Sequence, residues 1–171
     1  MKLLPVTDRK KEVVAHAMVD DDLFPHLSKM RWYDNGWGYP HTNHQNDDGS
    51  SIHVSLHSIV FKDKYGRHPL PGYEIDHIDQ NKLNAQRSNL RELTRSFNCA
   101  NKPKQPRNTS GYKGVSWNKN EQKWETRIQV NRKLVFLGYH TDKHEAARAV
   151  NRAYEKHFPG ISIPNPIAEV L

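Results

Sequence analysis

The sequence predicts an α+β protein in which a region of short strands and helices precedes a small three-stranded antiparallel sheet packed on one helix. Residues 124–130 alternate apolar and polar side chains, which is the period of a half-buried strand. Residues 142–158 place apolar side chains at helical spacing. Residues 11–33 instead mix short apolar pieces with acidic turns, which indicates several short elements.

In the first region, the acidic residues 20–22 precede apolar side chains at spacings of three and four, which predicts a short capped helix. Asn35 and Gly36 lie between two aromatic-rich segments and predict a turn between two strands. Residues 51–61 are periodic enough for a helix or a strand, and the pattern leaves both open.

In the second region, residues 111–117 predict a strand, residues 118–120 a turn, and residues 134–138 a third strand after the one at 124–130. Asp142 and Glu145 form a capping-box pattern at the start of a helix. One face of that helix carries Ala146, Val150, Ala153, Tyr154, His157 and Phe158.

Proline residues divide the chain. Pro103 and Pro106 lie among basic residues and predict an extended linker over residues 102–108. Pro159 and Gly160 end the second region and predict a disordered or loosely packed tail over 161–171. The expected parts are therefore residues 1–101, 102–108, 109–160 and 161–171.

The composition limits the classes of protein. The longest apolar runs are far below the roughly 20 residues that cross a bilayer, so no membrane partner is expected. A single cysteine, Cys99, excludes an internal disulfide and any zinc site that needs two thiolates. We expect a reducing, intracellular compartment, namely the cytoplasm, and no secretion.

Charge is unevenly distributed along the chain. Residues 1–86 carry a net charge of −2, whereas residues 87–160 carry +10. A basic block of this kind fits a polyanion such as DNA, and basic linkers often follow a phosphate backbone. On charge alone, a well-solvated basic surface explains the pattern equally well.

Residues 74–101 carry the chemistry. They read as a strand ending in Asp76 and His77, a polar loop, a second short strand, and a helix capped by Thr94. This order brings Asp76, His77 and Asn98 together. Carboxylate and amide oxygens suit Mg²⁺ or Mn²⁺, and a neutral imidazole can accept a proton from water that attacks phosphorus.

These residues resemble the HNH endonuclease motif, in the version of phage and intron-encoded homing endonucleases. Asn89 follows His77 by twelve positions, and Asn98 follows Asn89 by nine. The resemblance implies a ββα-metal nuclease region in which His77 is the general base and Asn89 a catalytic residue that pins the loop. It also implies that Asp76 and Asn98 bind Mg²⁺ or Mn²⁺ rather than Zn²⁺. Gln80 stands where a glycine is common.

Residues 109–160 resemble the Apetala-type (ethylene-response-factor-like) DNA-binding domain through residues 111–115, Trp124, residues 136–138 and residues 145–151. Such domains lay the sheet face opposite the helix into the major groove. That face would comprise Lys113, Ser116, Asn118, Arg127, Gln129, Leu134 and Phe136. With Lys119 and Lys133 at the turns and Lys102, Lys104 and Arg107 in the linker, these residues are the expected DNA contacts.

The other histidines give weaker evidence of a functional site. His144 begins a zinc-protease-like pattern, but Arg148 stands where the second ligand is needed. Histidine pairs at ligand-like spacing arise readily in a chain with 11 histidines. His57 precedes the nuclease segment, and a buried, hydrogen-bonded role is favoured there over contact with phosphate.

The sequence thus predicts a metal-dependent endonuclease of the homing type. It hydrolyses phosphodiester bonds of double-stranded DNA at sites that the second region selects, and no protein partner is implied. The alternatives are a non-catalytic DNA-binding regulator on the same scaffold, and a restriction or toxin nuclease with the same chemistry.

Overall fold

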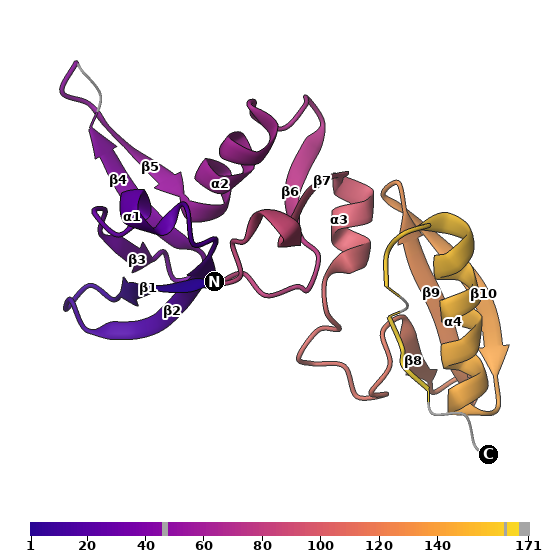
Figure 1. Ribbon diagram of the computed structural model, residues 1–171. Helices are drawn as coiled ribbons and strands as arrows, with labels where there is room; N and C mark the ends of the chain where they lie inside the picture. Colours follow the sequence, from indigo (N-terminus) through magenta and orange to yellow (C-terminus); the bar gives the residue numbers. More distant parts are fainter. Residues whose placement is uncertain (46–47, 163, 168–171) are drawn as a thin grey trace. The chain divides into compact units, whose positions relative to one another are not determined.

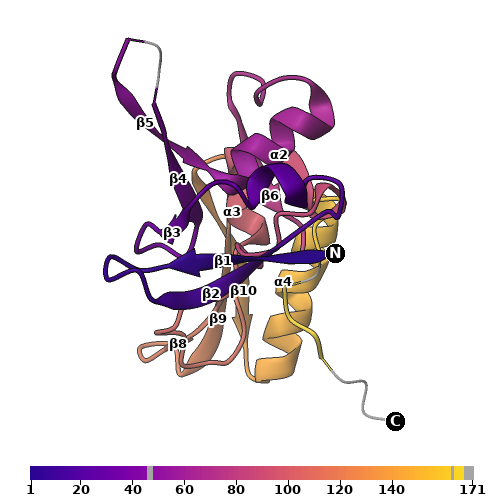
Figure 2. The ribbon, with the colours of Figure 1, turned by 60° about the vertical axis from the view of Figure 1, so that its left-hand side comes forward.

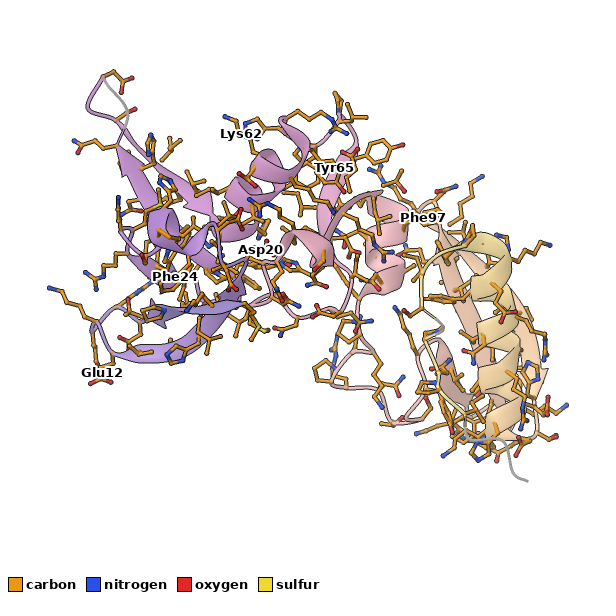
Figure 3. All side chains as sticks on the ribbon, viewed as in Figure 1. Glu12, Asp20, Phe24, Lys62, Tyr65 and Phe97 are labelled. Atoms are coloured by element: carbon orange, nitrogen blue, oxygen red, sulfur yellow. The ribbon has the colours of Figure 1, made fainter. Side chains whose placement is uncertain are left out.

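The computed structural model describes residues 1–45, 48–162 and 164–167 and divides into two compact units, Met1–Leu93 and Thr94–Leu171 (Figure 1). Each unit has its own hydrophobic core. The division falls before α3 (Arg95–Asn101), a helix that the sequence groups with the nuclease region. Phe97 of α3 instead packs edge-to-face on Phe158 of the second unit, with ring centroids 5.3 Å apart (Figure 3).

A five-stranded sheet forms most of the first unit. Its strands are β1 (Lys2–Thr7), β2 (Val13–Val19), β3 (Trp32–Asp34), β4 (Pro40–Gln45) and β5 (Ser51–Ser55), in the order β2-β1-β3-β4-β5. Only β1 and β3 pair in parallel among these strands. Figure 2 shows β4 and β5 running side by side. The predicted turn between β3 and β4 is confirmed, and Asp34 closes it by accepting hydrogen bonds from the backbone of Gly36 and Gly38.

The helix predicted after the acidic residues is only one turn long, α1 (Phe24–Leu27), and no side chain caps it. Two of the three acidic residues, Asp20 and Asp22, bind Arg87 instead, and Asp21 pairs with the N-terminal ammonium of Met1. Asp20 accepts from the Arg87 backbone N–H at 2.8 Å, and Asp22 accepts from Nη1 of Arg87 at 2.8 Å (Asp20 is labelled in Figure 3). The predicted capping was therefore wrong, because a long-range basic partner takes the carboxylates.

Residues 51–61 contain both structures that the sequence left open. Strand β5 ends at Ser55, and α2 (Leu56–Tyr65) begins immediately after it. Leu56, Val60 and Phe61 of α2 are buried in the core of the first unit. The helix ends at Gly66, whose φ of 67° is the left-handed conformation typical of a helix C-terminus.

A second, two-stranded sheet pairs β6 (Tyr73–His77) with β7 (Leu90–Thr94), and the short 3₁₀ helix η1 (Arg87–Asn89) precedes β7. The expected order of strand, polar loop, strand and helix is present, since α3 follows β7 directly. The protein is thus of the mixed α+β class.

The second unit contains an antiparallel sheet in the order β10-β9-β8, formed by β8 (Val115–Asn118), β9 (Lys123–Val130) and β10 (Lys133–His140). Helix α4 (Lys143–His157) lies along it (Figure 1). The predicted alternation holds over residues 126–129 of β9, where Thr126 and Ile128 are buried and Arg127 and Gln129 are exposed, but Glu125 on the polar side is also buried. The buried face of α4 comprises Ala146, Ala147, Val150, Ala153 and Tyr154.

Strand β8 begins later than predicted because residues 111–114 form a turn. Gly114 has a φ of 76°, and a Cβ added there would lie 2.8 Å from the carbonyl oxygen of Arg127. The carbonyl of Gly114 also accepts a hydrogen bond from the Arg127 N–H at 2.9 Å. Glycine therefore lets the turn approach β9 closely enough to begin the sheet.

Two details at the ends of α4 differ from the sequence-based expectation. Asp142 caps the helix by accepting from the Glu145 N–H at 2.7 Å, but the Glu145 carboxylate pairs with Arg148 instead of completing the capping box. The loose tail was wrong for residues 164–167, because Asn165 is only 2% exposed. Its side chain accepts from the Lys113 N–H at 2.7 Å and donates to the Lys113 carbonyl at 3.0 Å. Residues 163 and 168–171 of the expected tail lie outside the described residues.

Among the described residues, no helix combines the length and the apolar composition needed to cross a membrane.

Candidate functional site

Asp76 and His77 lie at the end of β6 and are both buried, with 4% and 6% of their surface exposed. Neighbouring residues of a regular strand face opposite sides. Here the strand stops at His77, and the His77 carbonyl accepts a hydrogen bond from the Gln80 N–H at 2.9 Å. The polar loop that begins there allows a carboxylate and an imidazole to lie at one strand end.

Asn89 organises that loop. Its Nδ2 donates to Oδ1 of Asp79 and to the carbonyl of Asn84, each at 2.8 Å, and its Oδ1 accepts from the Asp79 N–H at 3.0 Å. Asn84 also donates to Oδ2 of Asp79 at 2.8 Å. Asn89 is 7% exposed, so these hydrogen bonds satisfy a buried amide. They connect Asn89 to the two ends of the loop at Asp79 and Asn84.

Gln80 holds a left-handed backbone conformation in the same loop, with a φ of 65°. This is the position where the resembled motif commonly has glycine. A side chain with a Cβ costs about 1–2 kcal/mol in this conformation, whereas glycine adopts it without that penalty. The loop thus keeps its shape at some cost in stability.

Asp76 has a cationic partner. Nε of Arg91 in β7 donates to Oδ2 of Asp76 at 2.9 Å, and the Arg91 side chain is 23% exposed. The sequence singled out Arg91 only as part of the motif and gave it no role. Arg91 reaches the Asp76 carboxylate because β7 pairs with β6 in the two-stranded sheet.

The His77 imidazole lies among other rings. Its centroid is 5.3 Å from that of His57 and 6.0 Å from that of Tyr39. Burial lowers the pKa of His77, and this effect outweighs the nearby carboxylates of Asp79 and Asp76, which raise it. His77 is therefore neutral at pH 7, the form in which an imidazole accepts a proton.

His57 at the start of α2 is part of this ring cluster, and the sequence assigned it no catalytic role. Burial, followed by the neighbouring His77 and His41, lowers the pKa of His57 to about 3. Its Nε2 lies 3.1 Å from the Ser55 hydroxyl, whereas its buried Nδ1 has no hydrogen-bond partner within the described residues. The expectation of a buried, hydrogen-bonded histidine is met at one nitrogen.

The donor chemistry at this strand end fits a hard divalent cation. Within residues 1–45, 48–162 and 164–167, no three His, Cys, Asp or Glu side chains gather to hold a metal ion. Mg²⁺ needs no such cage, because it keeps several waters and binds through one or two carboxylates plus substrate phosphate. Asp76 supplies one such carboxylate. Asn98 lies in α3 of the second unit, where it is half-buried.

The second unit carries most of the positive charge. Residues 94–171 contain 14 Lys and Arg and 6 Asp and Glu, a net charge of +8, whereas residues 1–93 carry −1. On the sheet, the face opposite α4 is open to solvent. This exposed sheet face comprises Ser116, Arg127, Gln129, Leu134, Phe136 and Tyr139.

The exposed sheet face is unusually apolar along β10. Leu134 is 62% exposed, Phe136 51% and Tyr139 40%. Leu134 lies opposite Gln129, and Phe136 lies opposite Arg127. Lys119 and Lys133 are exposed at the two hairpin turns, and the linker residues Lys102, Lys104 and Arg107 are exposed as well.

Lys113 lies elsewhere than the sequence placed it, whereas Asn118 ends β8 on the expected sheet face, two residues after Ser116. Lys113 is in the turn before β8, where its ammonium donates to the Ala100 carbonyl at 2.6 Å and to the carbonyl of Lys102. Burial lowers the pKa of Lys113 to about 8. Asn118 uses its Oδ1 to close the β8–β9 turn and its Nδ2 to bind Glu125. Both side chains are thus engaged within the unit.

Three comparisons with known proteins follow from the sequence. Residues 54–100 match the family described as HNH endonuclease. The chain is 42% identical to Protein 3.8 of Escherichia phage T7 over 66 residues, which are 38% of the chain. This match spans 54% of that protein, about half its length. Over 152 residues, 88% of the chain, it is 30% identical to an uncharacterized HNH endonuclease of Acanthamoeba polyphaga mimivirus and spans 75% of it.

Proposed function

Since the chain belongs to the HNH endonuclease family, a family of DNA-cleaving enzymes, we propose that it hydrolyses phosphodiester bonds of double-stranded DNA with His77 as the general base. The observation that carries the proposal is the neutral, buried imidazole of His77 directly beside the carboxylate of Asp76 at the end of β6. A general base must be neutral and close to the reacting water, and the lowered pKa of His77 supports the first of these conditions.

The chain's own residues divide the work in this proposal. An imidazole nitrogen of His77 accepts the proton of the attacking water. Asn89 keeps the loop after β6 in one conformation through three hydrogen bonds, which fixes the direction of the imidazole. Arg91 holds the Asp76 carboxylate, and its exposed edge adds positive charge beside the site.

Asp76 would hold the metal ion, and the resemblance also assigns a ligand to Asn98. Mg²⁺ or Mn²⁺ supplies charge stabilisation for the leaving oxygen when it is bound. The hard oxygen donors of both residues favour these ions over Zn²⁺. The ββα-metal arrangement is part of this proposal.

The second unit would choose the DNA site. Its net charge of +8 supports attraction to phosphate, and its exposed sheet face offers Arg127 and Gln129, which can read guanine and adenine edges. The resemblance to the Apetala-type domain over 109–160 and the asparagine at position 98 together support a homing endonuclease. Lys119, Lys133 and the basic linker would contact phosphates.

Supercoiled plasmid tests the activity. The full chain should nick or linearise it when Mg²⁺ or Mn²⁺ is present and should leave it intact in EDTA. His77→Ala should reduce the rate about 10²–10⁴-fold. His44→Ala, the same substitution at an exposed histidine of β4, is the matched control and should cleave like the wild type.

Retention of full activity by His77→Ala would assign the base to another residue. DNA binding without any cleavage by the wild-type chain would instead favour the non-catalytic regulator.

A further inference from the structure

A buried carboxylate lies in the middle of the basic second unit. Glu125 belongs to β9 and is only 7% exposed, although its strand neighbours Lys123 and Arg127 on the same face are exposed. A buried acid costs free energy unless it is paired and hydrogen-bonded. It also weakens the attraction of this face for phosphate.

Glu125 joins two side chains of the sheet. One carboxylate oxygen pairs with Nε of Arg127, and the other accepts from Nδ2 of Asn118 at 2.8 Å. The hydroxyl of Tyr139 lies 3.5 Å from the same Nδ2. The network therefore spans β8, β9 and β10 and is anchored in the sheet.

Arg127 is held at two points. Its Nε faces Glu125, and its guanidinium carbon lies 6.0 Å from the centroid of the Phe136 ring. Among the residues that the structure describes, none accepts a hydrogen bond from Nη1 or Nη2 of Arg127. The side chain is 47% exposed, so the two terminal nitrogens are available to solvent.

These two nitrogens form the edge with which arginine binds guanine in the major groove, by paired hydrogen bonds to O6 and N7. A free arginine must lose side-chain entropy to bind in this way, and a pre-organised one loses less. The pair formed at Nε leaves that recognition edge open while it restricts the rest of the side chain.

We propose that Glu125 is a positioning residue that fixes Arg127 for reading one base pair and lowers the affinity of the exposed sheet face for other DNA. The proposal rests on the proposed function, because it assumes that this face meets DNA. Because of Glu125, the exposed sheet face attracts phosphate less strongly in general but discriminates better between base pairs at one position.

The test is selection from a randomised DNA duplex library by the full chain, followed by affinity measurements on the preferred duplex and its single-base variants. Glu125→Gln removes the charge and keeps the shape. It should reduce the preference at one base pair by about 5- to 150-fold, the value of a bidentate arginine contact. Binding to unrelated duplex should be unchanged or tighter.

Glu121→Gln is the matched control, since it removes the same charge from an exposed residue of the β8–β9 turn. It should leave the preference intact. Arg127→Lys keeps the charge but lacks the two terminal nitrogens that bind guanine, and it should lose the same preference as Glu125→Gln. In a double-mutant cycle, Arg127→Ala should cost little preference once Glu125 is glutamine.

Additive effects in this cycle, or a Glu125→Gln protein as selective as wild type, would overturn the proposal while leaving the DNA-binding face intact. If the wild-type chain shows no sequence preference, the proposed role of the second unit fails as well. A thermal unfolding scan of each variant separates these outcomes from misfolding. Should Glu125→Gln unfold, Arg127→Lys and Asn118→Ala decide the case, because an intact preference in both would overturn it.

Discussion

Nε of Arg91 donates to Oδ2 of Asp76 at 2.9 Å, so the carboxylate beside the candidate general base already has a cationic partner. A divalent cation bound by Asp76 shares that carboxylate with a guanidinium. The two positive groups together would attract a phosphate toward His77. The pair therefore links the stability of the β6–β7 sheet to the chemistry proposed for it.

Asp76→Ala and His77→Ala should fail in different ways. Without Asp76 the proposed site loses its anionic ligand, so cleavage should vanish and return in part at high Mg²⁺ or Mn²⁺. Without His77 the ligands remain, so added metal should not restore the rate. Cleavage rates across a metal titration distinguish the two variants. Rescue of His77→Ala by metal alone would contradict the assignment.

Arg91→Ala should destabilise the fold by about 2–4 kcal/mol, because it leaves the buried Asp76 carboxylate without its guanidinium. Arg31→Ala removes the same side chain from an exposed position of the first unit and should change stability by less than about 0.5 kcal/mol. Urea unfolding of both variants gives the comparison. Equal midpoints would show that the pair contributes nothing to stability.

Gln80→Gly should stabilise the protein by up to about 1 kcal/mol, since glycine adopts the φ of 65° without a Cβ penalty. The greater freedom of glycine in the unfolded chain keeps the gain small. Gln129→Gly in β9 should instead cost about 0.5–1 kcal/mol, because a strand conformation gains nothing from glycine. Melting temperatures of the two variants should move in opposite directions.

His57 should make stability depend on pH. Its pKa is about 3 in the folded protein and about 6.5 in the unfolded chain, so the unfolded chain binds the proton more readily. The stability is complete above pH 6.5 and is lost as the pH falls from 6.5 toward 3. One such group contributes a slope of at most about 1.4 kcal/mol per pH unit.

His57→Gln should flatten this slope, and His44→Gln on the exposed edge of β4 should leave it unchanged. Urea unfolding at pH 7.5, 6 and 5 measures the change of the unfolding free energy with pH in each variant. Part of the slope should remain in His57→Gln, because burial also lowers the pKa of His77. An unchanged slope would show that His57 does not contribute to it.

Local patterns predicted most of the second unit. The alternation in β9 and the apolar spacing of α4 follow from burial of one face, and that signal lies within the segment itself. The same signal failed at residues 20–22, because Asp20 and Asp22 bind Arg87, more than sixty residues away, and Asp21 pairs with the N-terminus. Pairings at such a distance depend on topology, which no local period encodes.

The candidate site shows the same division. The sequence singled out Asp76, His77 and Asn89 by their spacing, and the structure buries all three side chains. Arg91 and His57 were not, since their contacts arise from the pairing of β6 with β7 and from the start of α2. Glu125 had a readable signal, because it is an acid on the polar side of a strand in a basic block.

The buried side chain of Asn165 determines where a fragment that contains the second unit alone can end. This side chain hydrogen-bonds to both the N–H and the carbonyl of Lys113, and the backbone carbonyl of Asn165 accepts from Nδ2 of Asn151 in α4 at 2.7 Å. A fragment ending at the last turn of α4 would leave these three groups unsatisfied at the entrance to β8. A transplant of the second unit, the proposed DNA-binding part, onto another nuclease should therefore start before α3 and extend through residue 167.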